Sequence, residues 1–533
     1  MNLSLKVLAA GMLLLMLPVH SWADDPNTKI KVSGAKNVTV LLNEGVLYAS
    51  PNTFELGKKW DVSEEKNKIY VKLKSGAGRQ ESVQIPSKII SGKPYVDFGY
   101  FAGQSGITYK YDEKHKKITL KKESRDSGKK EEKKSRQVII WDPEHEFSTS
   151  SIKDVGKDNA IIISPTWGSY KDVSQNDFVP DLVYLKGIKD NGFNVLPLIH
   201  NDFDIPGTSA FMHDSKMQEK LISRIDAISE VYDLGGYNID FENMKQEDKN
   251  LYTDFIKKLS GAMHEQGKMV TVDVTVYNEW SPTWSLCYDR ENLAKAADYL
   301  VVMGYDETPG NSTVPGSVAS YSWLDDSIKV LKKSVPGEKM ILGLPLYTRV
   351  WVNESGRWKS RVLTLKYTDQ FISRHKLRPV WNDEEKQYTS SWKEKGTAYK
   401  TWLEDAKSLE DKMSLVGKYG LGGTAFWRYG FEAENTFSEL LNVKENQEKN
   451  GKIILRNIFI KSPGRRNYDC IVFTYVFYTA GAEFMFRIPY DDLPGLLFFF
   501  FFFQVPVSTE RTLKRRSLTS VFCSICFPPP KYL

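Results

Sequence analysis

The chain has 533 residues, 41% of them hydrophobic and 26% charged, which is enough for at least one large core and suggests two or three domains. Its net charge of +6 is small for this length and is not the concentrated basic face of a nucleic-acid-binding protein, so we expect no nucleic-acid partner. The four cysteines are sparse and the seven histidines do not cluster at ligand spacing. We therefore predict no disulfide framework, no metal site and no cofactor.

Residues 1–23 have the pattern of a secretory signal peptide. Lys6 precedes an apolar run over 7–19, and the small residues Ser21 and Ala23 follow at the positions that a signal peptidase reads. The run is too short to span a membrane, and no cysteine follows it to carry a lipid anchor. We expect secretion, with the mature chain beginning near Asp24; the alternative is a buried N-terminal helix.

Residues 28–122 alternate apolar and polar side chains between turn signals, which predicts a small β-rich α+β domain. Residues 60–71 align without gaps on residues 109–120, each copy indicating a strand, a charged turn and a second strand, although two hairpins can also match by chance. The region loosely resembles the stalk-like N-terminal domain of copper amine oxidases, which implies an accessory module facing the cell wall rather than copper binding. Residues 123–137 are almost all charged or small and predict a solvated linker.

The next region has the pattern of a parallel α/β protein, in which short apolar runs alternate with polar segments of helical character. Eight such units within residues 138–442 predict a (β/α)8 barrel, a TIM barrel, whereas a doubly wound open sheet would lead us to expect a glycine-rich phosphate turn after the first strand. The gap at about 352–420, between the seventh and eighth runs, predicts a small inserted α+β lobe. The eight runs are 138–141, 160–164, 194–199, 237–241, 269–276, 299–303, 340–344 and 423–427.

Residues 443–533 have a composition unlike the rest of the chain, with six consecutive phenylalanines over 498–503. A membrane anchor at 471–486 is conceivable, but Glu483 interrupts this short apolar run. We interpret the tail as the product of a shifted reading frame or a misjoined sequence and exclude it from the predicted fold.

Polar residues alternate along the fourth run. On a strand, Asn238, Asp240 and Glu242 point to one face, while Tyr237 and the other apolar residues point to the opposite face. In a barrel the polar set would face inward at the carboxyl end of the strand, where active sites of this fold lie. Two neighbouring carboxyls in a partly buried site should raise the pKa of at least one of them, as a proton donor near neutral pH requires.

This segment, Tyr237 to Asn243, resembles the fourth-strand signature of family-18 glycoside hydrolases. The resemblance implies retaining cleavage of β-linked N-acetylglucosamine glycans, assisted by the substrate's own acetamido group. It implies that Glu242 is the catalytic acid and base, that Asp240 orients the acetamido group, and that Asn238 is a hydrogen-bond partner of Asp240. The first acidic position of the signature is Gly235 here, with Asp233 two residues out of register.

Two further strand ends match the same family in the expected order. Met303-Gly304-Tyr305-Asp306 follows its Met-x-Tyr-Asp pattern, which implies a catalytic Tyr305 that steadies the acetamido oxygen and a substrate-binding role for Met303 and Asp306. Trp427 matches the tryptophan that forms the floor of the sugar subsite. Further candidates for the pocket or for sugar stacking, each equally open to a packing role, are Asp273, Tyr347, Arg428, Trp167, Trp280, Trp284 and Trp351.

Within the family, the segments 272–276, 287–290 and 427–430 look most like the bacterial branch of spore and cell-wall N-acetylglucosaminidases. We therefore expect a cell-wall- or spore-associated enzyme that acts on peptidoglycan, spore cortex or chitin, and the sequence does not choose between endo and exo cleavage. The alternative is a wall-glycan-binding protein on the same barrel, with Gly235 as a sign of lost activity. Loss of the catalytic acid is the simplest way for such an enzyme to become a binding protein. Retention of both Asp240 and Glu242 therefore favours an active enzyme.

Overall fold

The structure is a computed structural model, and it describes residues 28–33, 39–51, 60–74, 81–99, 102, 107–122, 136–147, 159–175 and 178–442, together with 458–459 and 471–472. The predicted signal peptide lies outside the described residues, as does nearly all of the predicted linker, whose last two residues, Arg136 and Gln137, already belong to a strand. The chain divides into two units, Met1–Leu440 and Leu441–Leu533. In the second, Ile458–Phe459 (β25) pairs with Ile471–Val472 (β26).

The N-terminal residues form two antiparallel-rich sheets, a seven-stranded one in the order β7-β8-β3-β2-β1-β10-β9 and a three-stranded one in the order β4-β5-β6. Both repeat segments fold as hairpins, but their turns differ in length: Lys66 and Asn67 join β4 to β5, whereas residues 113–116 join β9 to β10. The strands are β1 Thr28–Ser33, β2 Val40–Asn43, β3 Val46–Ala49, β4 Trp60–Glu65, β5 Lys68–Leu73, β6 Ser82–Ile85, β7 Lys88–Ile90, β8 Lys93–Asp97, β9 Ile107–Asp112 and β10 Lys117–Lys122.

The predicted barrel is confirmed. Eight parallel strand positions follow one another as β11-β24-β18-β17-β16-β15-β14-β12, and β11 also pairs with β12, which closes the ring. The third position is broken into two short strands, β13 and β14. The strands are β11 Arg136–Asp142, β12 Asn159–Ser169, β13 Asn194–Val195, β14 Leu198–His200, β15 Gly236–Asp240, β16 Met269–Thr275, β17 Tyr299–Met303, β18 Met340–Pro345 and β24 Gly423–Trp427.

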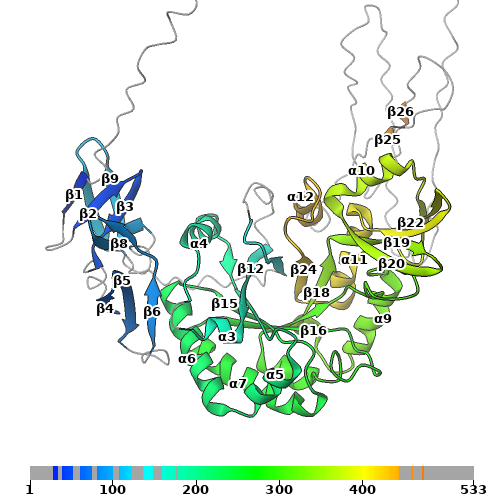
Figure 1. Ribbon diagram of the computed structural model, residues 1–533, viewed down its shortest axis with the longest axis horizontal. Helices are drawn as coiled ribbons and strands as arrows, with labels where there is room; N and C mark the ends of the chain where they lie inside the picture. The colour runs from blue at the N-terminus through cyan, green and yellow to red at the C-terminus, as the bar shows by residue number, and fades with distance from the viewer. Residues whose placement is uncertain are drawn as a thin grey trace, which may run out of the picture. The chain divides into compact units, whose positions relative to one another are not determined.

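Helices surround the barrel, as Figure 1 shows for α5, α6 and α7 beside the central strands. Helix α7 buries Tyr252, Phe255, Ile256, Leu259 and Met263, a spacing of three and four residues that places them on the face toward the sheet. The helices are α3 Tyr170–Val173, α4 Leu182–Lys189, α5 Ile205–Met212, α6 Ser215–Val231, η4 Gln246–Asp248, α7 Lys249–Glu265, α8 Arg290–Ala296, α9 Tyr321–Leu331, η5 Gly337–Lys339, α11 Ala406–Tyr419 and α12 Thr436–Asn442.

The inside of the barrel is filled by side chains from every second position of its strands. Ile139 and Trp141 of β11 pack there with Leu198, Val301 and Ile341, all of them at most 2% exposed. Tyr305 and Trp427 pack against this cluster. The barrel is therefore a filled core whose upper layer is aromatic, and the carboxyl ends of the strands lie around that layer.

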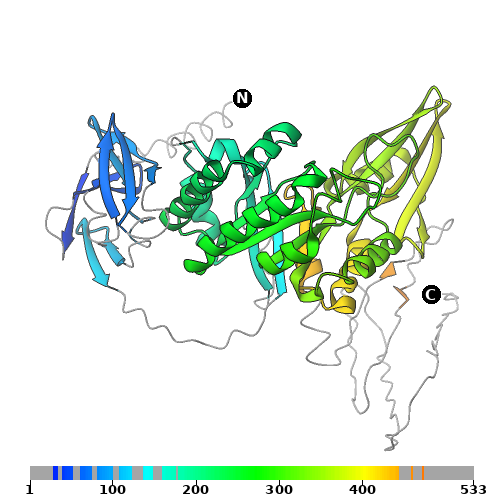
Figure 2. The ribbon, with the colours of Figure 1, turned by 90° about the horizontal axis from the view of Figure 1, so that it is seen from below.

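A five-stranded antiparallel sheet in the order β20-β19-β23-β22-β21 is inserted between β18 and β24. It begins at Tyr347 and ends at Leu403. The predicted insertion, 352–420, also includes α11, but this helix contacts α9 and β24 of the barrel. Figure 2 shows the long strands of the inserted sheet in yellow-green. The lobe consists of β19 Tyr347–Glu354, β20 Arg357–Thr364, α10 Leu365–His375, β21 Val380–Asn382, β22 Gln387–Glu394 and β23 Thr397–Leu403.

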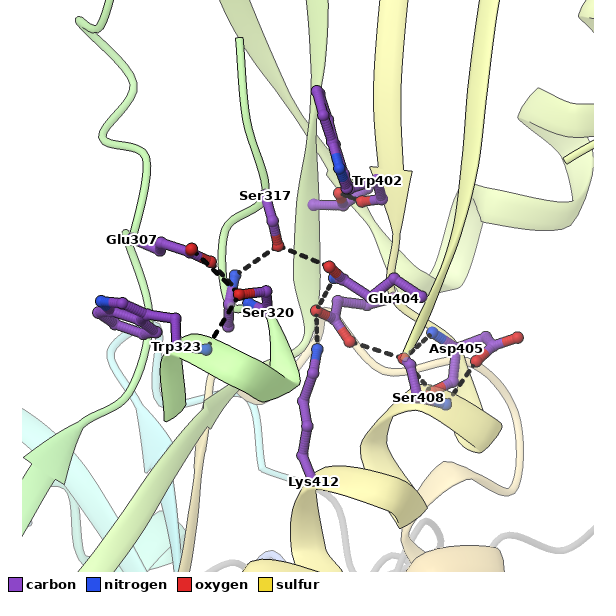
Figure 3. Close-up of polar contacts among 12 residues, drawn as sticks. Glu307, Ser317, Ser320, Trp323, Trp402, Glu404, Asp405, Ser408 and Lys412 are labelled. Carbon is purple, nitrogen blue, oxygen red and sulfur yellow. Dashed lines mark hydrogen bonds and ion pairs between the residues drawn. The ribbon is translucent and has the colours of Figure 1, made fainter. Parts of the chain in front are cut away.

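A buried polar cluster joins this lobe to the barrel. Lys412 and Ser408 of α11 point toward Glu404, which follows β23 (Figure 3). The Gln387 amide of β22 donates to the same carboxylate at 2.6 Å and accepts from Ser317 Oγ at 2.6 Å. Lys412 and Glu404 are fully buried, and the charges and hydrogen bonds offset the cost of removing them from water.

Within the part of the chain that the structure describes, no helix is both long and apolar enough to cross a lipid bilayer.

Candidate active site

The alternation expected along the fourth barrel strand is present. Tyr237 and Phe241 point outward, where the Tyr237 hydroxyl donates to Ile225 O of α6 at 2.8 Å and the Phe241 ring stacks near Tyr252 of α7. Gly236 is required at the start of β15, because its φ is +145° and an added Cβ would lie 1.8 Å from Met269 O of β16. The opposite face of the strand carries Asn238 and Asp240, and Glu242 follows two residues later.

Asn238 is fully buried inside the barrel, and all four hydrogen bonds of its side chain go to other strands. Its amide nitrogen donates to Asp273 Oδ1 at 2.7 Å and to Thr271 Oγ1 at 3.0 Å, both on β16. Its amide oxygen accepts from Trp141 Nε1 at 2.8 Å and from Ser164 Oγ at 3.2 Å. The expectation that Asn238 bonds to Asp240 is therefore wrong: residues two apart on a strand project side by side, and the adjacent strand β16, together with β11 and β12, supplies the partners of the Asn238 side chain.

Three carboxyls meet in this region, and burial raises the pKa of each. The pKa of Asp240 is raised to about 7 by burial, and Asp240 Oδ1 is enclosed with no hydrogen-bond partner among the described residues. Burial and then the charges of Asp240 and Asp306 raise the pKa of Glu242 well above its usual range. Burial and the Asp240 charge likewise raise the pKa of Asp273, against the Asn238 hydrogen bond that lowers it. These three carboxyls therefore retain protons between them at neutral pH.

Aromatic rings form the floor beside these carboxyls. The Trp141 ring lies 5.7 Å from Trp427 and 6.3 Å from Tyr305, and Tyr305 and Trp427 are roughly parallel at 6.3 Å. Gly343 of β18 leaves room for them, since an added Cβ would lie 3.3 Å from Trp141 Cη2 and 3.5 Å from Tyr305 Cε1. Burial, and then the charges of Asp273, Asp240 and Glu242, raise the pKa of Tyr305, so its hydroxyl stays protonated as a donor. Met303, 9% exposed, ends β17 just before this floor.

Asp306 links the barrel to the inserted lobe. Its Oδ1 accepts a hydrogen bond from the Tyr347 hydroxyl at 2.7 Å and forms an ion pair with Arg349 at 2.8 Å. Arg349, on β19, was not predicted, because nothing in the lobe sequence distinguishes it from the lobe's other basic residues. A Cβ added at Gly310 would lie only 2.5 Å from Arg349 Nη1. The glycine therefore lets the loop after β17 pack directly against the Arg349 guanidinium.

Arg428 and Asp233 make their contacts away from the three carboxyls. Arg428 forms an ion pair with Glu144 at 3.1 Å and its guanidinium lies 4.3 Å from the centre of the Phe431 ring, so its contacts are with the rim. Asp233, the displaced acidic residue of the signature, pairs with Lys189 at 2.5 Å on the outside and is 64% exposed. It does not replace the acidic side chain missing at Gly235.

Two buried residues that were not among the predicted site residues hold the backbone at Phe241 and Glu242 in place. Asn201 Oδ1 accepts from Glu242 N at 3.0 Å, and Asn201 Nδ2 donates to Glu242 O at 2.7 Å. The Tyr288 hydroxyl donates to Phe241 O at 2.9 Å. Asn201 directly follows β14, which is its only sequence signal, and Tyr288 lies in the segment 287–290 that resembles the bacterial branch of the family. Both keep Glu242 at the mouth after β15 has ended.

The arrangement offers a proton-retaining carboxyl, a second carboxyl beside it, a tyrosine donor and an indole floor. An indole face suits the C–H face of a sugar ring, and a protonated carboxyl can donate to an ether oxygen.

Comparison with known proteins agrees with this geometry. The family described as Glycosyl hydrolases family 18 matches residues 94–432. The "Uncharacterized glycosylase YvbX" of Bacillus subtilis is 29% identical over 237 residues, which are 44% of this chain and 68% of that protein. The "Cortical fragment-lytic enzyme" of Bacillus anthracis is 22% identical over 249 residues, 44% of this chain and 57% of that protein. The chain thus spans between about half and two thirds of the length of such curated relatives.

Solved structures share the fold. A chitinase from Chromobacterium violaceum superposes with a TM-score of 0.51 at 22% identity, covering 57% of this chain and 98% of that chain. The Bacillus cereus spore cortex-lytic enzyme SleL superposes with a TM-score of 0.51 at 17% identity, covering 58% of this chain and 75% of that chain. At these identities the likeness establishes the barrel and not the substrate.

Proposed function

Because the chain belongs to glycosyl hydrolases family 18, we propose that it hydrolyses β-1,4-linked N-acetylglucosamine glycans with retention of anomeric configuration. The observation that carries the proposal is the position of Glu242 and Asp240, with raised pKa values, beside Tyr305 and the indole of Trp427. Relatives named as cortical fragment-lytic enzymes and chitinases support glycans of this class.

In the first step, Glu242 gives its proton to the glycosidic oxygen as the bond from that oxygen to the anomeric carbon breaks. The carbonyl oxygen of the substrate's own acetamido group attacks the same carbon and forms an oxazolinium ring. Asp240, as a carboxylate, accepts a hydrogen bond from the acetamido N–H and balances the positive charge that develops there. Tyr305 donates its hydroxyl proton in a hydrogen bond to the acetamido oxygen and so holds it in line.

In the second step, Glu242 is the base. It removes a proton from a water molecule that attacks the anomeric carbon, and the oxazolinium ring opens to restore the acetamido group. Two inversions at one carbon give retention. The raised pKa of Glu242 serves both steps, because it holds a proton near neutral pH and accepts one readily after donating it.

We further propose that the protein is exported and acts on peptidoglycan, spore cortex or chitin at the cell wall. The signal-like composition of residues 1–23 supports export, and the additional β-rich module before the barrel supports attachment to a wall polymer. Mass spectrometry of the products from digested peptidoglycan, with chitin oligomers alongside, distinguishes the substrates and the mode of cleavage. Proton NMR of the first product formed should show the β-anomer.

Turnover of a chromogenic N-acetylglucosamine oligomer tests the activity itself. Glu242→Gln should abolish it, because an amide cannot supply the proton, while Glu247→Gln, at an exposed position of the 3-10 helix η4, should leave it unchanged. The alternative, a wall-glycan-binding protein, predicts no turnover by the unaltered protein and equal binding of the oligomer by both variants.

A further inference from the structure

Charge is divided unevenly along the chain. Residues 28–122, the β-rich module, hold 18 lysines and arginines against nine aspartates and glutamates, a net charge of +9. Residues 138–442, the barrel and its lobe, hold 35 against 45, a net charge of −10. The small net charge of the whole chain, +6, therefore combines a basic module with an acidic catalytic part. A polyanion attracts the first and repels the second.

Exposed lysines gather on one face of the seven-stranded sheet, at the end formed by β1, β10 and β9. Lys117 of β10 is the backbone partner of Lys31 in β1, and Lys29, two residues before Lys31, lies on the same face. Lys110 of β9 lies diagonally across from Lys117, at a backbone separation of about 7–8 Å. The opposite face of β10 is apolar, since Ile118 is fully buried. We call the three exposed residues Lys29, Lys110 and Lys117 the lysine face.

The two aligned hairpins of the module allow an internal comparison. The β9-β10 hairpin belongs to the lysine face, and the β4-β5 hairpin is its counterpart in the three-stranded sheet. Where the first hairpin has Lys110 and Lys114, the second has Asp61 and Glu65 at the aligned positions. Two hairpins of similar sequence thus differ by reversal of charge, and the positive one lies on the lysine face.

The acidic side chains near the lysine face do not neutralise it. Elsewhere in the module, Lys88 forms an ion pair with Glu44 at 2.5 Å. On the lysine face, strand alternation places Asp112 beside the lysines, but this carboxylate accepts a hydrogen bond from the His115 backbone N–H at 3.0 Å and lies 2.8 Å from the His115 ring nitrogen. One carboxylate that is already engaged, set against three ammonium groups, leaves an excess of positive charge.

The chemistry of the module indicates which wall polymer it suits. Stacking on a neutral sugar needs an exposed aromatic ring, and every tyrosine and phenylalanine side chain that the structure describes in the module is buried or half-buried. All of the module's basic residues except Arg79 are lysines. A lysine ammonium is a compact point charge on a flexible stem, so it suits a flexible chain of phosphate groups, whereas arginine suits one planar anion held in a fixed geometry.

We propose that the lysine face binds a polyanionic polymer of the cell wall, one whose repeating units are linked through phosphate. The inference rests on the wall location proposed above. It gives the basic module the role of holding the acidic catalytic part near a surface that repels it. Binding of this kind releases counterions from the polymer and therefore weakens steeply as the salt concentration increases.

Co-sedimentation with purified Gram-positive cell walls tests the proposal on the full chain. Glu242→Gln is the parent protein, so that the wall is not digested during the measurement. Treatment with hydrofluoric acid removes phosphate-linked polymers and leaves peptidoglycan, and it should weaken binding by roughly tenfold or more. Soluble polyphosphate should compete with the untreated wall. Equal binding to treated and untreated walls overturns the proposal.

Single substitutions locate the site. Lys110→Gln and Lys117→Gln should each weaken binding to the wall by roughly fivefold at about 0.15 M salt. Lys68→Gln is the matched control, because Lys68 is exposed and has the position in the β4-β5 hairpin that Lys117 has in the β9-β10 hairpin. At this salt concentration screening limits the reach of a charge to about 8 Å, so the control should change the affinity by less than about twofold. An equal loss in all three variants assigns binding to overall charge and overturns the lysine face.

Two further measurements separate this inference from the proposed hydrolase and from a membrane. With Glu242 intact, Lys110→Gln and Lys117→Gln should turn over the chromogenic oligomer at the unaltered rate, because both lysines lie outside the barrel. Wall binding that none of the variants changes, with turnover retained, overturns the lysine face and leaves the hydrolase standing; absent turnover with the expected binding losses does the reverse. Tighter binding to vesicles of phosphatidylglycerol and phosphatidylcholine than to the wall assigns the face to a membrane and overturns the proposal.

Discussion

Asn238 stands where an aspartate would add a fourth carboxyl to Asp240, Glu242 and Asp273, and Asn238→Asp tests what the amide contributes. Residues two apart on a strand are about 6.6 Å apart. At an effective dielectric constant of 20, two unit charges at that distance repel by about 2.5 kcal/mol, which corresponds to roughly 1.8 pKa units. The new carboxyl would itself be partly protonated, so we expect the pKa of Asp240 to rise by about one unit.

The sign of the effect follows from the role proposed for Asp240. Activity requires Asp240 as a carboxylate and Glu242 protonated, so kcat/KM should rise as pH increases through the pKa of Asp240, about 7, and fall as Glu242 loses its proton. Raising the pKa of Asp240 moves the acid limb of the profile to higher pH. The assay is kcat/KM for a chromogenic oligomer between about pH 4 and 9.

Asn238→Ala is the matched control. It removes the hydrogen bonds that the Asn238 amide donates to Asp273 and Thr271, as Asp does, and also the one it accepts from Trp141, but adds no charge, so it should lower the rate and leave the acid limb in place. An acid limb that Asn238→Asp does not move, or that both variants move equally, refutes the electrostatic reasoning.

Three further predictions concern the supports of the site. Lys412→Met should lower the free energy of unfolding by about 3–5 kcal/mol, because it leaves Glu404 as an unpaired buried charge, and replacing Glu404 by Met as well should recover much of the loss; chemical denaturation measures both. Asn201→Ala should lower kcat roughly tenfold with unchanged circular dichroism, because the backbone of Glu242 loses two anchors; an unchanged kcat would contradict this. Asp240→Asn should stabilise the fold more at pH 8 than at pH 4, because a carboxyl whose pKa is raised on folding makes the folded state less stable as pH rises through that pKa; equal effects at both pH values would count against a raised pKa.

The sequence by itself determined the repeated strand and helix pattern, because alternating apolar runs and polar helices leave few ways to bury the runs other than a closed parallel barrel. It also determined that Asn238 and Asp240 share a face, since the side-chain period of a strand is two. This alternation follows from the geometry of a single strand and does not depend on which strands lie beside it.

Only the tertiary structure decided which side chains from distant segments contact one another in and around the barrel. Asn238 bonds to Asp273 and Trp141 rather than to Asp240, and Arg349 reaches Asp306 from a lobe more than forty positions later in the chain. Of the four tryptophans considered for sugar stacking, Trp167 lies within β12 and Trp351 within β19 and both are buried, whereas Trp280 and Trp284 lie in the loop after β16 and are exposed. Contacts between distant segments depend on the order of the strands around the barrel and on the positions of the loops above it. Neither can be predicted from a short stretch of sequence.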